Sequence, residues 1–170
     1  RDRPPPPPPD LAPAMTVAGW RVPIQAFCSD GRHGVRHSRV LDFGRPWDEP
    51  AQRRLAGLKP GFSTRLGAAL RHAARALIQV PAQRRFAIVL GDGEPHDIDI
   101  HEPGYLAEDA RHAVQTARLI GVCSLCLVPG TKAAPSVQRV FGAEGSGVAS
   151  GIDALPRLAG RLLRGRNWSA

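Results

Sequence analysis

A group of acidic side chains follows directly after a short apolar run, and these residues are the best suited in the sequence to carry chemistry. The run covers residues 86–90, and Asp92, Glu94, Asp97 and Asp99 come soon after it. The run indicates a strand buried on both faces of a parallel sheet. Ligands bind at the carboxyl edge of open α/β sheets, and carboxylate oxygens suit a hard cation. Asp92 is therefore the first candidate for a functional residue.

The same loop allows a catalytic interpretation. Residues 92–102 also contain His96, His101 and Glu102, so a metal-dependent hydrolase centre is one alternative. The spacing of these residues follows no fixed ligand motif, and Pro95 marks the segment as a loop. We favour a solvated loop that shapes a binding face.

The elements around this loop alternate between strands and helices. Strands are expected over residues 21–28, 35–43, 86–90, 122–128 and 147–149, and helices over residues 46–58, 64–79, 106–120, 135–141 and 152–163. A turn at Ser29, Asp30 and Gly31 joins the first two strands into an antiparallel or edge pair. This alternation predicts the α/β class, with a doubly wound, mostly parallel sheet and helices on both faces.

Length and composition set the domain organisation. A chain of 170 residues with 42% hydrophobic content can bury one ordinary core. We expect a proline-rich disordered leader over residues 1–14, one domain over residues 15–166 and a short tail over residues 167–170. Six consecutive prolines in the leader form a polyproline II rod without backbone donors. That composition indicates a spacer, with a docking site for a proline-binding module as the alternative.

The net charge of +8 comes from arginine, since Lys59 and Lys132 are the only lysines. A basic balance favours acidic partners, and a nucleic-acid-binding domain is a second alternative. The arginines are scattered, however, and aromatic content is only 5%, so a continuous basic surface with stacking aromatics is not expected.

The apolar stretches and the cysteines of the sequence limit its cellular location and its redox chemistry. No stretch approaches the roughly 20 apolar residues of a membrane span, and a secretory signal is lacking, so a cytoplasmic protein is expected. The odd set of Cys28, Cys123 and Cys126 argues against a disulfide framework. Cys123 and Cys126 form a C-x-x-C within an expected strand, where positions three apart face opposite sides.

Two short motifs follow one another along the chain. Thr64 begins T-R-L-G-A-A-L at the start of an expected helix, and Asp92 with Gly93 ends the later strand. The pair resembles the von Willebrand factor A (VWA) domain, whose metal-ion-dependent adhesion site (MIDAS) uses such a threonine and aspartate. Segments such as GFSTRLGAALRHA and LGDGEPHDIDIHEPGYLAEDARHAV look like the C-terminal VWA domain of NorD and CbbO proteins, bacterial accessory factors of nitric oxide reductase and rubisco. The resemblance covers residues 17–164.

This resemblance implies an interaction module and not an enzyme. In that family the VWA domain works beside a MoxR-type AAA+ ATPase, and the pair activates or assembles a target metalloenzyme in a chaperone-like role. It further implies Mg²⁺ as the cofactor, with Thr64 and Asp92 as metal ligands. An open coordination position would accept a carboxylate from the partner protein. Without a metal, Thr64 would cap its helix and Asp92 would stabilise the turn at Gly93.

The residues around the two ligands form the expected partner-binding face. This face consists of Ser63, Glu94, Asp97 and Asp99. The sequence departs from the family in one respect, because D-x-S-x-S, the main MIDAS signature at the end of the first, central strand, does not occur. The proline leader stands where that strand is expected. We therefore expect an N-terminally incomplete domain, in which the two strands beside the gap lack a partner and the metal site is partial.

Overall fold

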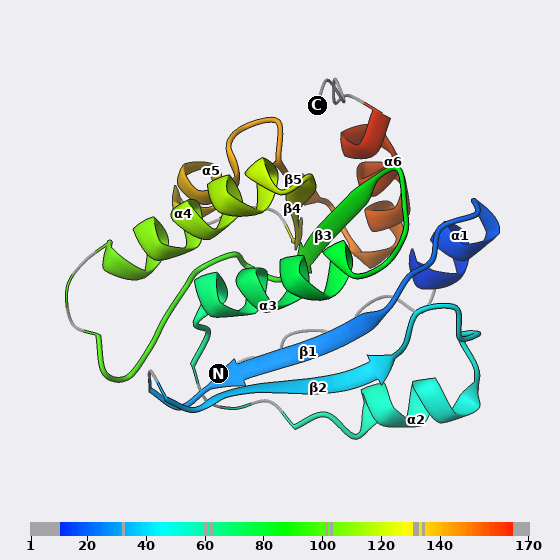
Figure 1. The fold of residues 1–170 in the computed structure, drawn as a ribbon, viewed down its shortest axis with the longest axis horizontal. Helices are drawn as coiled ribbons and strands as arrows, with labels where there is room; N and C mark the ends of the chain where they lie inside the picture. Colours follow the sequence, from blue (N-terminus) through cyan, green and yellow to red (C-terminus); the bar gives the residue numbers. More distant parts are fainter. Residues whose placement is uncertain are drawn as a thin grey trace.

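The computed structural model describes residues 11–31, 33–59, 61, 63–100, 102, 104–130, 133 and 135–164. Its elements in chain order are α1 (Leu11–Val17), β1 (Ile24–Ser29), β2 (Val35–Leu41), α2 (Glu49–Ala56), α3 (Leu66–Ile78), β3 (Arg85–Leu90), α4 (Tyr105–Leu119), β4 (Val122–Pro129), α5 (Pro135–Phe141), β5 (Ser146–Ala149), a 3₁₀ turn (Ile152–Ala154) and α6 (Leu155–Arg164) (Figure 1). The predicted alternation of strands and helices is confirmed. Residues 1–10 of the expected leader and the expected tail lie outside the described residues, whereas residues 11–14 form the start of α1.

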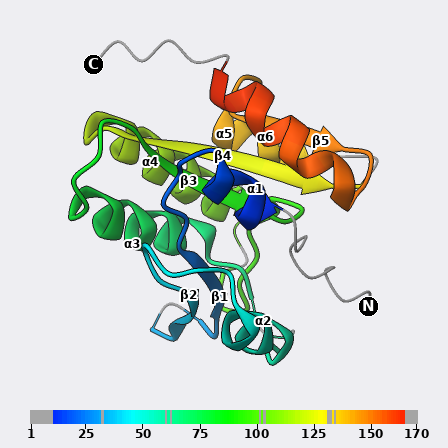
Figure 2. The ribbon, with the colours of Figure 1, turned by 90° about the vertical axis from the view of Figure 1, so that its right-hand side faces the viewer.

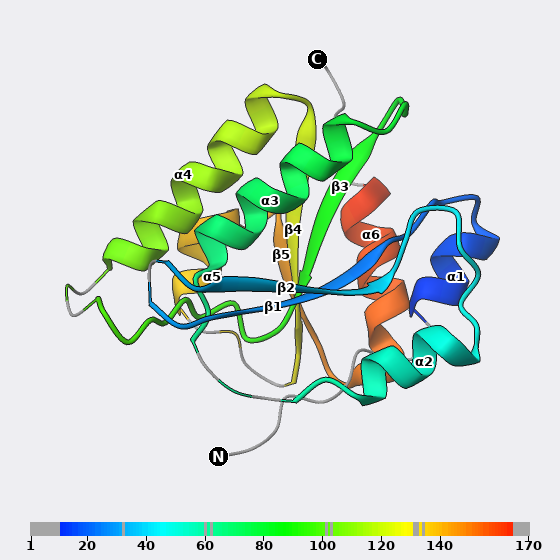
Figure 3. The same cartoon turned by 60° about the horizontal axis from the view of Figure 1, so that its bottom comes forward.

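The strands form two sheets. Strands β3, β4 and β5 are parallel neighbours in that order, with Ile88 opposite Leu125 and Leu127 opposite Gly147. Strands β1 and β2 form a separate antiparallel pair, as predicted, with Phe27 opposite His37. Helices α1 and α2 lie at one end of this pair (Figures 1 and 3).

Helices cover both faces of the parallel sheet (Figure 2). On one face, α3, α4 and α5 pack against β3 and β4 in a core that includes Leu70, Cys126 and Val137. On the other face, α6 and α1 bury Leu127 and Leu155 in a second core. Strand β4 separates the two cores and its consecutive residues 124–128 are all buried. Its alternating side chains supply both layers.

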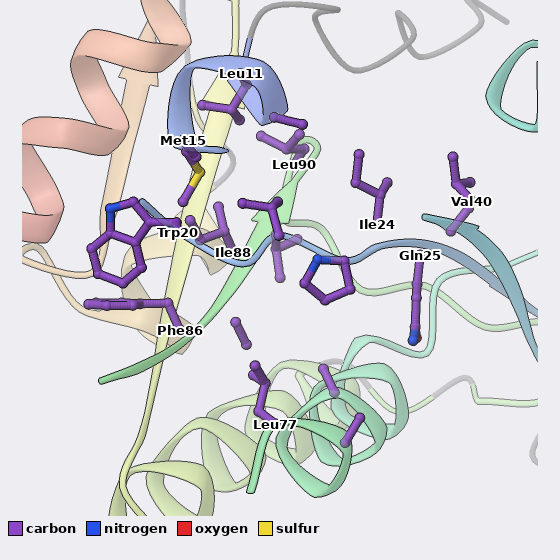
Figure 4. Close-up of a pocket in the computed structure, with 18 of the residues that line it drawn as sticks. Leu11, Met15, Trp20, Ile24, Gln25, Val40, Leu77, Phe86, Ile88 and Leu90 are labelled. Atoms are coloured by element: carbon purple, nitrogen blue, oxygen red, sulfur yellow. The ribbon is translucent and has the colours of Figure 1, made fainter. Parts of the chain in front are cut away.

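Strand β3 differs from the expectation of burial on both faces. Only Ala87 in this strand is buried, and Leu90 remains 37% exposed. The reason lies beside the strand, where an apolar cleft separates β3 from β1 (Figure 4). Strand pairing in the described part of the chain joins β3 to β4 and β1 to β2, but it does not join β1 to β3.

None of the described helices combines the length and the apolar character that crossing a membrane requires.

Candidate functional site

Three segments meet where β1 and β3 end. They are Ser29 at the end of β1, residues 63–65 before α3, and residues 91–100 of the loop after β3. Ser29 and Ser63 exchange backbone hydrogen bonds of 2.8 and 2.7 Å. Thr64 and His96 exchange two more, of 2.7 and 3.1 Å. These pairings attach the acidic loop to the segment that carries Thr64, so the two predicted motifs lie at one edge of the fold.

Arg65 holds the acidic loop in place. Its Nε donates to Asp97 Oδ2 at 2.8 Å and its Nη2 donates to Asp99 Oδ1 at 2.5 Å. The Ser29 hydroxyl donates to the same Asp97 oxygen at 3.1 Å and accepts from the Arg65 N–H at 3.1 Å. The second Asp97 oxygen accepts from the Ile98 N–H at 2.7 Å. Asp97 is thus fully engaged as the anchor of the loop.

The environment of Asp97 favours its ionised form. Burial by itself would raise the pKa of the Asp97 carboxyl, but the hydrogen bonds from Arg65, Ser29 and Ile98 and the charge of Arg65 outweigh it. The pKa of Asp97 therefore lies below its usual value. The pKa of Arg65 is raised, because its bonds to Asp97 and Asp99 exceed the effect of burial. The pair remains charged across the physiological range.

The low pKa of Asp97 makes the stability of the protein sensitive to acid. An unfolded aspartate has a pKa of about 3.9. The stabilisation from a lowered folded pKa is complete above that value and is lost as the pH falls through the folded pKa. We expect the free energy of unfolding in urea to fall more between about pH 6 and about pH 3 for the wild type than for Asp97→Asn. Parallel losses in the two proteins would contradict this role.

Asp92 and Glu94 differ from Asp97 in being exposed. The Glu94 N–H donates to Asp92 Oδ1 at 3.0 Å, which forms a short turn around Gly93. One Asp92 carboxylate oxygen therefore stabilises the turn, as one of the two metal-free interpretations predicted. A carboxylate has lone pairs beyond those used by one N–H, so Asp92 can also face a ligand.

Gly93 is required at this turn for two reasons. Its φ is +70°, a left-handed conformation that side chains rarely adopt. A Cβ atom at this position would also lie 2.5 Å from Val137 Cγ2 and 3.2 Å from Cys126 Sγ. The Asp92–Gly93 turn therefore packs directly on the core beneath it.

Cys126 lies in that core. Burial raises the pKa of its thiol to about 12, and the nearby charge of Asp92 adds to the effect. Cys126 is completely buried on β4, whereas Cys123 is half-buried. Cys28, Cys123 and Cys126 are not joined in disulfides.

Thr64 does not have the capping role considered for it. Helix α3 begins at Leu66, and its N-cap is Arg65, which makes no side-chain capping hydrogen bond. The backbone of Thr64 pairs with His96 instead. The hydroxyl of Thr64 and the carboxylate of Asp92 are hard oxygen donors and suit Mg²⁺ in kind. Among the residues that the structure describes, however, no three His, Cys, Asp or Glu residues are grouped so as to hold a metal ion.

The residues of the predicted partner-binding face differ in their exposure to solvent. Ser63 and Asp97 are buried, at 4% exposure each, and Asp99 is half-buried against Arg65. Glu94 is the one exposed residue of the predicted partner-binding face. Sequence reasoning missed Ser29 and Arg65, which organise the loop. An arginine directly before an apolar helix with acids downstream was the available signal, but the pairing spans 32 residues and depends on how the loop folds.

Solved structures identify the class of fold. The chain superposes on the manganese-loaded TRAP protein of Plasmodium vivax with a TM-score of 0.61 and 12% identity, covering 84% of this chain and 57% of that one. It superposes on proximal thread matrix protein 1 of the mussel byssus, in a structure with a zinc-occupied MIDAS motif, with a TM-score of 0.59 and 13% identity, covering 91% and 41%. These matches show that the fold is VWA-like, a mixed α/β fold with a parallel sheet flanked by helices.

Sequence comparison identifies the particular relatives. The chain is homologous to part of NorD, with 35% identity over 146 residues to NorD of Brucella suis, which covers 86% of this chain and 23% of that protein. NorD of Stutzerimonas stutzeri is 33% identical over 131 residues, which covers 77% and 21%. The chain thus spans about a quarter of the length of these curated relatives. No protein-family model matches the sequence.

Proposed function

We propose that this chain is a protein-interaction adaptor. In this role it works with a MoxR-type AAA+ ATPase in the cytoplasm to activate or assemble a metalloenzyme of the nitric oxide reductase or rubisco type. The observation that carries the proposal is the homology to NorD over 86% of the chain. The edge with Thr64, Asp92 and Glu94 is its partner-binding site. The rigid attachment of the loop supports this choice, because a preorganised face loses less entropy on binding.

Different residues of the face have different tasks in this proposal. Glu94 is exposed and Asp99 is half-buried, and they contact the partner. Ser63 and Asp97 are buried, and they hold the face in shape through Ser29 and Arg65.

Thr64 and Asp92 are the proposed protein ligands of Mg²⁺. When bound, the cation supplies a coordination position for a carboxylate of the partner. The donor chemistry fits, because both side chains offer oxygen atoms and Asp92 is exposed. Asp97 contributes no ligand, because Arg65 and Ser29 donate to one of its carboxylate oxygens and the Ile98 N–H donates to the other. With two protein ligands, affinity in the free chain is low, and the partner's carboxylate strengthens it.

Binding to a purified MoxR-type AAA+ ATPase from the same genome tests this function. We expect binding of the 170-residue chain in Mg²⁺, and a loss of about tenfold or more in affinity for Asp92→Ala, because a charge-assisted contact is removed. A chelator should weaken the wild type to the same extent and should leave Asp92→Ala unchanged.

Glu144→Ala is the matched control, since Glu144 is an exposed acid just before β5, at the opposite edge of the sheet. Its affinity should equal that of the wild type. Equal losses in both variants would indicate a general charge effect and would contradict the proposed site. The absence of any binding to the ATPase would overturn the adaptor function itself.

A further inference from the structure

Two histidine rings stack on one another between β2 and α3. The ring centres of His37 on β2 and His72 on α3 are 3.9 Å apart, and the planes of the two rings meet at 19°. His37 is half-buried and His72 is exposed. His37 also lies opposite Phe27 of β1, with the two ring centres 6.4 Å apart. The imidazole pair therefore joins the antiparallel sheet to a helix of the main core.

The elements around these two rings carry many basic side chains and few acidic ones. Strand β1 has no charged residue, and residues 50–91, which include all of α3, contain neither aspartate nor glutamate. The acidic residues of α2, of α4 and of the turn after β2 are each bound to an arginine: Glu49 to Arg53, Glu108 to Arg111, Asp109 to Arg71 and Asp42 to Arg39. The other charged or titratable residues on β2, β3, α2, α3 and α4 are basic, namely Arg36, Arg54, Arg75, Arg85, His112 and Arg118. A proton added to the imidazole pair therefore enters basic surroundings.

These surroundings favour the neutral form of His37. Burial lowers the pKa of His37, and the charge of a protonated His72 lowers it further. Neutral imidazole rings can stack without electrostatic repulsion, whereas two protonated rings would place like charges only 3.9 Å apart. The stack is therefore favourable while at least one ring is neutral, and it becomes repulsive when both rings are charged.

The two elements that the stack joins also carry the residues that anchor the acidic loop. Strand β1 ends at Ser29, two residues beyond Phe27, and α3 begins directly after Arg65. Ser29 and Arg65 both donate to Asp97, and the Arg65 N–H donates to the Ser29 hydroxyl. Movement of the β1–β2 pair away from α3 would separate Ser29 from Arg65. It would therefore take away part of the support of Asp97.

We propose that the His37–His72 stack is an acid-sensitive contact that holds the β1–β2 pair against α3 and thereby keeps the acidic loop in place. Near neutral pH the uncharged rings remain stacked. In mild acid both rings gain a proton, and their repulsion loosens the β1–β2 pair. Ser29 then separates from Asp97, and the loop loses one of its anchors. The proposal depends neither on metal binding nor on the ATPase partner.

Urea unfolding of the 170-residue chain at pH 7.5 and pH 5.5 tests the contact. An unfolded histidine has a pKa of about 6.5. Because the pKa of His37 is lowered in the folded protein, the stability that its neutral form contributes is complete above about pH 6.5 and is lost as the pH falls toward the folded pKa. We expect the unfolding equilibrium constant to rise about fivefold more for the wild type than for His72→Gln, which matches the repulsion of two unit charges about 4 Å apart in water. His37→Gln should show the same reduced loss.

His112→Gln is the matched control, because His112 is an exposed histidine on α4. Its unfolding equilibrium constant should rise as much as that of the wild type between the two pH values. The carboxylates of the acidic loop do not interfere with this comparison, because aspartates and glutamates titrate well below pH 5.5.

Nuclear magnetic resonance gives two readouts that a purely structural role would not change. The pKa of His37, followed by its imidazole proton signals, should be higher in His72→Gln than in the wild type, because the charge of His72 is then absent. The Ser29 and Ser63 amide hydrogens bond to each other's carbonyl groups, so their exchange reports the attachment of β1 to the segment before α3. After correction for the intrinsic exchange rate, their protection should fall about fivefold between pH 7.5 and pH 5.5 in the wild type and less in His72→Gln.

Three results would overturn the proposal. An identical titration of His37 in the wild type and in His72→Gln would show that the two rings do not interact. Equal losses of stability in these two proteins between pH 7.5 and pH 5.5 would show that the stack does not hold the β1–β2 pair. Unchanged protection of the Ser29 and Ser63 amides over this range would show that the loop is not coupled to the stack.

Discussion

Replacing Arg65 with methionine should destabilise the protein by about 3 kcal/mol, measured as the free energy of unfolding in urea. The Asp97 side chain is fully inaccessible to solvent, and Arg65 is its charged partner, with 12% of the side chain exposed. Methionine keeps much of the apolar stem but leaves the Asp97 carboxylate buried without a counter-charge. Removing one partner of a buried pair costs more than the pair contributes, because the remaining charge stays desolvated. The expected loss of about 3 kcal/mol is at the low end of the range for breaking buried ion pairs. The reason is that Asp99, the second partner of Arg65, is partly exposed.

Two further variants separate this effect from general loss of charge. Arg53→Met breaks an ion pair with Glu49 whose side chains are 65% and 78% exposed, and it should cost at most about 1 kcal/mol. The double variant with Arg65→Met and Asp97→Asn removes the buried charge and should be more stable than Arg65→Met alone. A loss of under about 1 kcal/mol in Arg65→Met would show that Asp97 is solvated and would contradict its role as the loop anchor.

Gly93→Ala should be similarly destabilising, by about 3 kcal/mol, from two separate causes. A left-handed conformation costs an L-residue about 1–2 kcal/mol, and overpacking of a core typically costs about 1–3 kcal/mol. The new methyl group would lie 2.5 Å from Val137 Cγ2, and Val137 is completely buried. Thermal or urea unfolding measures the loss.

Gly142→Ala is the matched control for the backbone cost. Gly142 has a φ of +74°, but a Cβ atom added there would meet no atom of the described residues within 4 Å. Only the conformational cost of about 1–2 kcal/mol therefore applies. Val137→Ala should reduce the penalty of Gly93→Ala when the two changes are combined, because it removes the contacting methyl group. Equal losses at Gly93 and Gly142 would show that the turn does not pack tightly on the core.

The sequence predicted the elements and the edge at which the motifs meet because both follow from local rules. Apolar periodicity identified α3 and α4, and the carboxyl ends of parallel strands share one edge, to which Thr64 is attached through its backbone pairing with His96. It could not predict that Asp97 is buried. That depends on Arg65 and Ser29, which lie 32 and 68 residues away along the chain, and on a loop conformation that no periodicity specifies.

The partial exposure of β3 was missed for a related reason. An apolar run indicates that a strand can be buried, but burial also requires neighbours on both faces and both edges. Ile88 and Leu90 lie beside the cleft, and this part of the prediction failed where the sheet is interrupted.

The buried thiol of Cys126 gives the protein an internal reporter of its own opening. A thiol reacts with alkylating reagents as the thiolate, and a pKa of about 12 leaves almost none of it at neutral pH. Cys126 therefore becomes reactive only in molecules whose sheet has separated from α5 and from the turn at Gly93. The alkylation rate of Cys126 therefore measures how often the protein opens locally in this region. The half-buried Cys28 and Cys123 provide the comparison within the same molecule.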